Sequence, residues 1–167
     1  MNKRNFATSL FLFSIAIFGY VCLFAQKNPS SFDRGSFYAA LSSGSSSKID
    51  EQLSLLKSNS IEEKNAFEGA LLMRKAGLVS APPKKLNLFK QGNKKLEAAI
   101  KADMDNAEYR FLRLMIQENS PGILDYKGNI KSDGEFIRQS YKNLPPAIQK
   151  AILDYCKISK TLKAADL

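Results

Sequence analysis

Apolar residues recur at the spacing of α-helices along most of the 167-residue chain, and this pattern limits its fold more than any other feature. We predict helices over about 37–41, 48–57, 60–77, 84–102, 105–118, 133–144 and 146–158. No stretch alternates apolar and polar residues as a half-buried strand would. The sequence therefore predicts an all-α fold, a compact array of about six to seven helices in helical hairpins or an irregular bundle.

Capping and turn residues separate these predicted helices. A Ser/Gly run at 42–47, Pro121-Gly122 and Pro145-Pro146 interrupt the helical pattern. Residues 60–63, 105–108 and 132–135 each place a polar residue three positions before a glutamate, as in a capping box. We therefore expect new helices to begin at these three points.

The N-terminal segment has the pattern of an export signal. Lys3 and Arg4 precede an uncharged, mostly apolar run at 6–24, which ends at Ala25 before a polar stretch. This pattern predicts a signal peptide over 1–25 and an exported protein, periplasmic or secreted. Because the run is nearly long enough to span a bilayer, an uncleaved N-terminal anchor is the alternative. We expect 26–31 to be a short polar lead, 32–160 a single helical domain and 161–167 a flexible tail.

The composition excludes several kinds of functional site. The chain has no His, which removes His-based catalysis and His-ligated metal sites. Two cysteines are too few for a four-thiolate zinc site or a disulfide framework. No Gly-rich phosphate loop or nucleophile elbow is present. We therefore predict no catalytic, metal or cofactor site, and a protein that acts by binding.

The segment 94–113 resembles the junction between two tetratricopeptide repeats. Gly92, Leu96 and Ala99 match the small–large–small pattern of that family. The turn 103–108, Asp-Met-Asp-Asn-Ala-Glu, matches the family's turn, with Met104 where Pro is usual. The resemblance covers about one fifth of the residues after the predicted signal. It implies an array of helical hairpins that binds proteins or peptides.

A candidate partner groove lies on the predicted helix 105–118. Apolar residues cover more than half of its circumference, so we expect other helices to surround it. Arg110, Arg113 and Gln117 share the remaining narrow face. Arginine forks suit carboxylates and peptide groups, so these residues could line a groove for an envelope protein or peptide. The alternative is that they form the solvated stripe of a buried helix.

Two charged residues fall within predicted apolar arcs. Arg74 lies between Phe67 and Leu78, and Glu118 lies close to Met115. A charge that faces a core needs a partner, so Arg74 and Glu118 are candidates for a buried ion pair, with both residues reaching outward to water as the alternative. Glu118 is also the starting point for a remote alternative, a lysozyme-like glycosidase with Asp125 as the nearest later acid.

Lysines give the chain a formal net charge of +9 and form a candidate anion-binding face. This face, which we call the lysine face, consists of Lys84, Lys90, Lys94, Lys95 and Lys101 on the predicted helix 84–102. Such a field attracts anionic lipid or polysaccharide, while a solubilising surface is the alternative. We expect no nucleic-acid partner, because the predicted signal directs the chain out of the cell.

Overall fold

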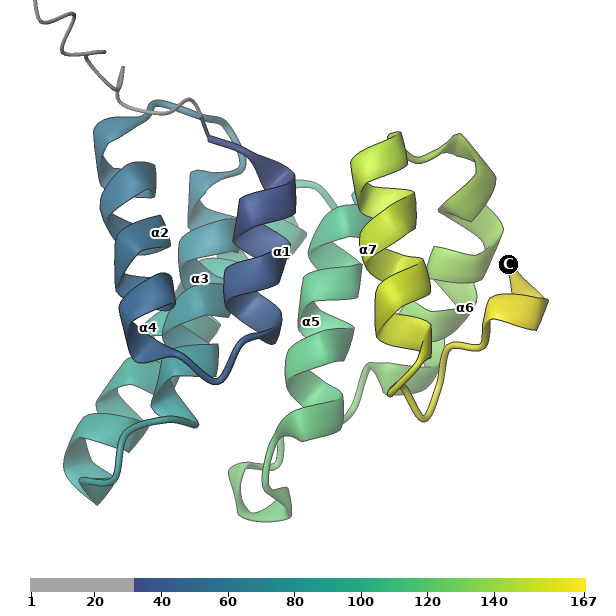
Figure 1. Ribbon diagram of the computed structural model, residues 1–167. Helices are drawn as coiled ribbons and strands as arrows, with labels where there is room; N and C mark the ends of the chain where they lie inside the picture. The colour runs from purple at the N-terminus through teal and green to yellow at the C-terminus, as the bar shows by residue number, and fades with distance from the viewer. Residues whose placement is uncertain (1–31) are drawn as a thin grey trace, which may run out of the picture.

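The computed structural model describes residues 32–167, so the predicted signal peptide or anchor at 1–25 and the lead at 26–31 lie outside the described residues (Figure 1). Residues 32–167 form helices and no strand, which confirms the all-α prediction. The seven α-helices of this part are α1 (Arg34–Ser42), α2 (Ser46–Ser58), α3 (Lys64–Ala76), α4 (Pro82–Ala102), α5 (Ala107–Asn119), α6 (Ile130–Ser140) and α7 (Pro146–Cys156). Three short 3₁₀ turns accompany them, η1 (Gly122–Leu124), η2 (Tyr141–Asn143) and η3 (Ala164–Asp166).

Short polar side chains cap three of the helices. The side chain of Asp33 accepts a hydrogen bond of 2.7 Å from the Ser36 amide at the start of α1. The side chain of Asn106 accepts one of 3.1 Å from the Tyr109 amide at the start of α5. Each bond satisfies a backbone donor that has no partner inside the helix. Ser45 does the same for α2.

None of the three predicted capping boxes forms. The cap of α5 is Asn106 and not Asp105, and Glu108 pairs with Arg34 instead. The structure starts α3 at Lys64, after residues 60–63, and Glu63 makes no side-chain cap. The structure starts α6 at Ile130, so the segment 132–135 lies inside that helix. Asp133 is fully buried there, where it pairs with an arginine of α5 instead of capping a helix. The local pattern could not reveal this partner, which is 20 residues away in the chain.

Helix α5 is the centre of the fold, as its apolar circumference predicted. It packs against α3, α4, α6 and α7, and ten of its 13 residues are buried. Phe111 is completely buried, and its ring lies 5.8 Å from the rings of Tyr38 on α1 and Tyr155 on α7, measured between centroids. Residues from several helices therefore meet in one continuous core around α5.

Helices α3 and α4 make the most extensive contact between two helices of the described residues, and two glycines allow their backbones to approach closely. A Cβ atom built on Gly92 would lie 2.5 Å from the carbonyl oxygen of Gly69, and one built on Gly69 would lie 2.7 Å from the amide nitrogen of Leu96. Both distances are shorter than any normal contact of a Cβ atom. The two backbones can approach only because neither position has a side chain.

We predict that Gly92→Ala lowers the free energy of unfolding by about 1–3 kcal/mol, the usual cost of overpacking. Two of the neighbouring atoms, the carbonyl oxygen of Gly69 and the amide nitrogen of Met73 at 2.9 Å, belong to the backbone and cannot rotate away. The cost should exceed the gain of about 1 kcal/mol that alanine brings to a helix. Urea titration measures the change. Gly128→Ala is the control, since a Cβ there meets nothing within 4 Å. Equal stability of both variants would contradict the prediction.

The expected flexible tail is instead an ordered part of the fold. Leu162 is completely buried, and Leu167 packs against the core cluster. A Cβ on Gly134 of α6 would lie 2.6 Å from the Cγ2 atom of Thr161, so the segment runs directly over α6. Buried apolar contacts and the close packing of the Thr161 side chain on Gly134 hold residues 161–167 in place, and the prediction of flexibility is wrong.

Candidate binding groove

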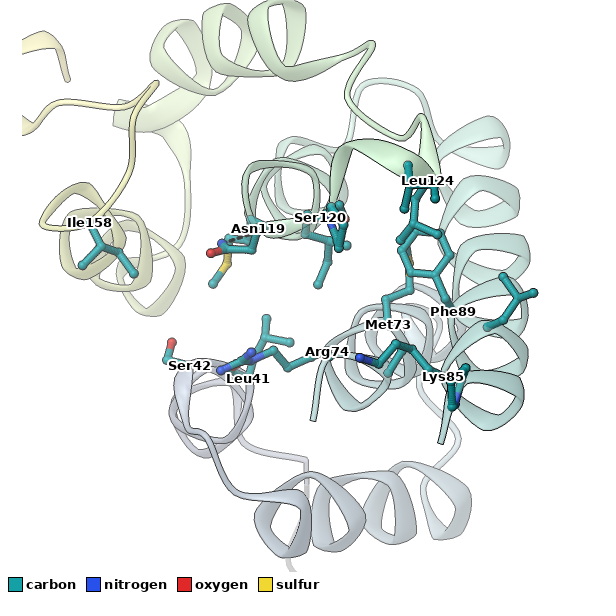
Figure 2. A pocket seen from close by; sticks show the side chains of 18 of the residues that line it. Leu41, Ser42, Met73, Arg74, Lys85, Phe89, Asn119, Ser120, Leu124 and Ile158 are labelled. Carbon is teal, nitrogen blue, oxygen red and sulfur yellow. Dashed lines mark hydrogen bonds between the residues drawn. The ribbon is translucent and has the colours of Figure 1, made fainter. Parts of the chain in front are cut away.

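A hollow of about 490 Å³ lies where the C-terminal ends of α1, α3, α5 and α7 meet the first turns of α4 (Figure 2). Figure 2 shows Ile158 on one side of the hollow and Phe89 and Leu124 on the other. We call this hollow the groove. Its walls are mainly apolar, and the apolar residues among them are Leu41, Met73, Ala76, Pro82, Leu86, Phe89, Met115, Ile116, Pro121, Ile123, Leu124, Tyr155 and Ile158.

Three large apolar side chains at the groove are open to solvent. Ile123 on η1 is 93% exposed, Ile158 after α7 is 73% exposed and Leu86 on α4 is 45% exposed. Single exposed apolar residues are common on protein surfaces, but three around one apolar hollow form a patch. This patch is suited to an apolar ligand or partner.

A second hollow of about 360 Å³ continues the groove between α1 and α7. It shares four lining residues with the groove, which are Ser42, Met115, Tyr155 and Ile158. The other residues that line it include Tyr38, Ala39, Ala151 and Asp154. Together the two hollows form an elongated depression, so an extended or helical segment would fit better than a compact molecule.

The candidate residues Arg110, Arg113 and Gln117 do lie together, but they line no groove for a partner. They face α6, which covers them. The guanidinium of Arg113 donates two hydrogen bonds, of 2.7 and 2.8 Å, to the carboxylate of Asp133, and Arg113 is 7% exposed. The prediction of a partner groove on this face is wrong, because these residues are used to hold α6 against α5.

The remaining contacts of this face are also internal. The guanidinium carbon of Arg110 lies 4.1 Å from the centre of the Phe136 ring, and its Nη1 atom lies 3.6 Å from Asp133. The amide of Gln117 donates a hydrogen bond of 3.3 Å to Asn129. On α4, Glu97 adds a second carboxylate 3.0 Å from Arg113. The alternative of a solvated stripe is therefore wrong as well.

The predicted ion pair between Arg74 and Glu118 does not form. The Nε and Nη2 atoms of Arg74 donate to the carbonyl oxygens of Leu41 and Ser43, at 2.9 and 3.1 Å. These carbonyls belong to the C-terminal end of α1, where a helix leaves its last acceptors without partners. Arg74 thus supplies hydrogen-bond donors to the last carbonyls of a neighbouring helix. Figure 2 shows its side chain reaching from α3 toward Leu41.

Glu118 accepts hydrogen bonds from the segment that follows α7. Its donors are the hydroxyl of Tyr155 at 2.7 Å, the hydroxyl of Ser159 at 2.9 Å, and the amides of Lys160 and Thr161 at 3.0 and 2.8 Å. Burial raises the pKa of Glu118, but the hydrogen bonds from Thr161, Tyr155 and Ser159 outweigh it, so the pKa lies below its ordinary value. A glycosidase acid requires the opposite shift. The surroundings of Glu118 therefore give no support to the lysozyme-like alternative.

The lowered pKa of Glu118 predicts a loss of stability in acid. Because the folded pKa lies below the unfolded one, the ionised form stabilises the fold above about pH 4.5, and this contribution disappears as pH falls through the folded pKa. Glu118→Gln should lower the free energy of unfolding by about 1.5–3 kcal/mol at neutral pH, which is the usual contribution of a hydrogen bond to a charged group. The difference between the two proteins should shrink on acidification. Urea titrations of both proteins across this range measure it, and a constant difference would contradict the prediction.

The lysine face is present as predicted on one helix. Lys84, Lys90, Lys94 and Lys101 are exposed on α4. Within residues 32–167, no carboxylate lies within 4.0 Å of these four ammonium groups. Lys95 differs from them, since it is half-buried and pairs with Glu68 of α3 at 2.8 Å. Four of the five predicted lysines are therefore free to meet an anion.

A cluster of charged residues that was not predicted from the sequence joins α1, the start of α3 and α5. The Nε atom of Arg34 lies 3.1 Å from Glu108, and its Nη2 atom lies 2.6 Å from Glu63. The hydroxyl of Tyr38 donates a hydrogen bond of 3.1 Å to Glu108. Burial raises the pKa of Glu108, although the charge of Arg34 acts against it. The only local signal for this cluster in the sequence was Glu108 in the first turn of α5, where it matched the glutamate of a capping box.

Comparison of the chain with protein-family models, curated proteins and solved structures finds no match. No helix within residues 32–167 is both long and apolar enough to cross a membrane. In this same part of the chain, no three Cys, Asp or Glu side chains gather in a way that could hold a metal ion. The groove and the lysine face are therefore the features on which a functional proposal has to rest.

Proposed function

We propose that this protein is an exported, non-enzymatic binding protein of the cell envelope, and that its groove receives a segment of a partner protein. The observation that carries the proposal is the set of exposed apolar residues, Leu86, Ile123 and Ile158, around an apolar hollow of about 490 Å³. Exposed apolar patches of this kind mark interaction sites on soluble domains. Burial of these three side chains would drive association.

Two features of the sequence support the rest of the proposal. The basic start, apolar run and Ala25 support export, to the periplasm or out of the cell, with N-terminal anchoring as the alternative. The resemblance of 94–113 to a tetratricopeptide junction supports a TPR-like arrangement of helical hairpins. Proteins of that architecture present concave surfaces to partner segments.

Site-specific photo-crosslinking in the native host tests the proposal. A photoreactive phenylalanine analogue is placed at Ile123 or Ile158 in the groove, and at Met104 or Leu153 as controls. Met104 and Leu153 are large apolar residues, 64% and 41% exposed, and neither lines the groove. We expect the two groove positions to capture the same partner and the control positions to capture none. The same products at all four positions, or no product at the groove, would contradict the proposal.

The lysine face supports a second candidate function, an electrostatic adaptor for anionic lipid or polysaccharide. Four exposed lysines without a carboxylate partner among the described residues favour it. Lys90 to Lys101 spans eleven residues of α4, about 16 Å along the helix axis. Lysines are flexible point charges, so this face would recognise charge and not shape.

Reversing Lys90, Lys94 and Lys101 to Glu should abolish binding to anionic phospholipid vesicles and to acidic polysaccharide. Wild-type binding should weaken steeply with salt, because the attraction is screened within about 8 Å at physiological ionic strength. Co-sedimentation measures binding to the vesicles, and gel shift measures binding to the polysaccharide. The matched control reverses Lys48, Lys57 and Lys131, which are exposed lysines on α2 and α6. Equal effects of the two triple variants, or no wild-type binding at low salt, would remove this candidate.

A further inference from the structure

We infer that the groove selects a partner segment in which an acidic side chain accompanies the apolar ones, and that Arg74 and Lys85 receive this acidic side chain. The inference rests on the proposed function, because it names the chemistry of the segment that the groove would bind. It depends on the charges that line the groove and on the way in which one of them is held.

Arg74 is a cation with a fixed position and no carboxylate partner. Two of its nitrogens donate to the C-terminal carbonyls of α1, which fixes the plane of the guanidinium. Arg34 and Arg113 each pair with carboxylates, whereas no carboxylate lies within 4.0 Å of Arg74 in the described part of the chain. The half-buried Arg74 lines the groove, and its Nη1 atom makes no hydrogen bond to residues 32–167.

The charged side chains that line the groove are both cations. Lys85, in the first turn of α4, lines the groove together with Arg74, and no Asp or Glu is among the residues that line it. The acid that lines the adjoining hollow, Asp154, is paired with Lys150 and Lys157. Two cations beside an apolar floor complement a segment that combines apolar and acidic side chains.

The shape of the surface favours a protein segment over a lipid. An alkyl chain could fill the hollow but would leave Ile123 and Ile158 exposed beside it. A flat membrane surface would cover these two residues but would not fill the hollow. A helical segment with apolar residues on one face could do both, because it can occupy the depression and extend across its edges.

A display library of amphipathic helical peptides, selected on the purified full-length protein, tests the inference. The apolar positions of the amphipathic pattern are fixed, and all other positions of the peptides are randomised. Each selected peptide is compared with a neutral variant that has Gln for Glu or Asn for Asp. Fluorescence anisotropy measures the affinity of both peptides for the wild-type protein, for Lys85→Glu and for Arg74→Lys. We expect selected peptides to contain acids, and neutralising the acid to weaken wild-type binding by about tenfold. Lys85→Glu, at an exposed position, should weaken acidic peptides more than their neutral variants.

The outcomes separate this inference from the proposed function. If peptides bind in the groove with the same affinity whether or not they are acidic, the charge selection is wrong and the proposed function stands. If binding is unaffected by removing Leu86 and Ile158, the proposed function itself fails. If dodecanoate displaced the bound peptide and its methyl ester did not, Arg74 and Lys85 would bind the carboxylate of a lipid, and the inference of an acidic protein segment would be wrong. The result for Arg74→Lys counts only if the circular dichroism spectrum of this variant matches that of the wild type. If the spectra differ, the exposed variant Lys85→Glu still decides the test.

Discussion

Replacing Phe111 with alanine is expected to lower the free energy of unfolding by about 3–5 kcal/mol. The ring is completely buried on the central helix α5, between Tyr38 of α1 and Tyr155 of α7. The fold around it is already closely packed, so the cavity left by the ring would not fill without moving whole helices. A loss of this size is a large share of the ~5–15 kcal/mol that typically stabilises a domain.

The matched control for this prediction is Phe136→Ala. Phe136 is only half-buried on α6, where one face of its ring meets the guanidinium of Arg110. Its removal deletes the same number of atoms but less buried surface, so we expect a clearly smaller loss. Denaturant titration at constant pH measures both variants. A loss below about 1 kcal/mol for Phe111→Ala, the size of an ordinary surface change, would show that α5 is not the centre of the core.

Asp133→Asn should cost about 3–5 kcal/mol, the usual result of removing one partner of a buried ion pair. Asp133 is fully buried and accepts two hydrogen bonds from Arg113 in a side-by-side geometry. Asparagine has nearly the same shape but no charge, so the guanidinium of Arg113 would remain in the interior without a buried counter-charge. The effect should also appear in structure, as a loosening of α6 from α5.

Glu97→Gln is the control for this second prediction. Glu97 also pairs with Arg113, but its side chain is about one third exposed, so water can replace it. We expect a loss of only about 1 kcal/mol or less, as for surface ion pairs. Hydrogen exchange of the amides of α6 measures the loosening. If both variants lost the same free energy of unfolding, burial would not determine how much each ion pair contributes to stability.

Helical spacing predicted the fold well because it depends on neighbours within a few residues. The pattern around Phe111 correctly identified α5 as the most covered helix, since apolar residues on most of its circumference require partners on several sides. Positions of polar residues were harder to predict. Asp133 has the local pattern of a helix cap, but its partner Arg113 lies on another helix, and only the folded chain brings the two together.

The groove could not be predicted because it is formed by the ends of five helices, and these ends lie between residues 41 and 158 of the chain. Two local signals for it existed. Leu86 lies outside the apolar stripe of its helix, and Ile123 is a large apolar residue in a Pro-Gly turn. The last helix was predicted to extend to residue 158, but α7 ends at Cys156 and leaves Ile158 exposed. Apolar residues that do not fit a helical stripe were thus the available indicators of a binding surface.

The affinity of a crosslinked partner's segment for two double variants tests the central claim most directly. Leu86→Ser with Ile158→Ser removes two apolar side chains of the groove, and Met104→Ser with Leu153→Ser removes two exposed apolar side chains elsewhere. If the groove is the binding site, the first pair should weaken binding at least about tenfold, since burial of each such side chain contributes on the order of 1 kcal/mol or more. The second pair should leave the affinity unchanged. Equal affinities of the two double variants in isothermal titration calorimetry would contradict the account.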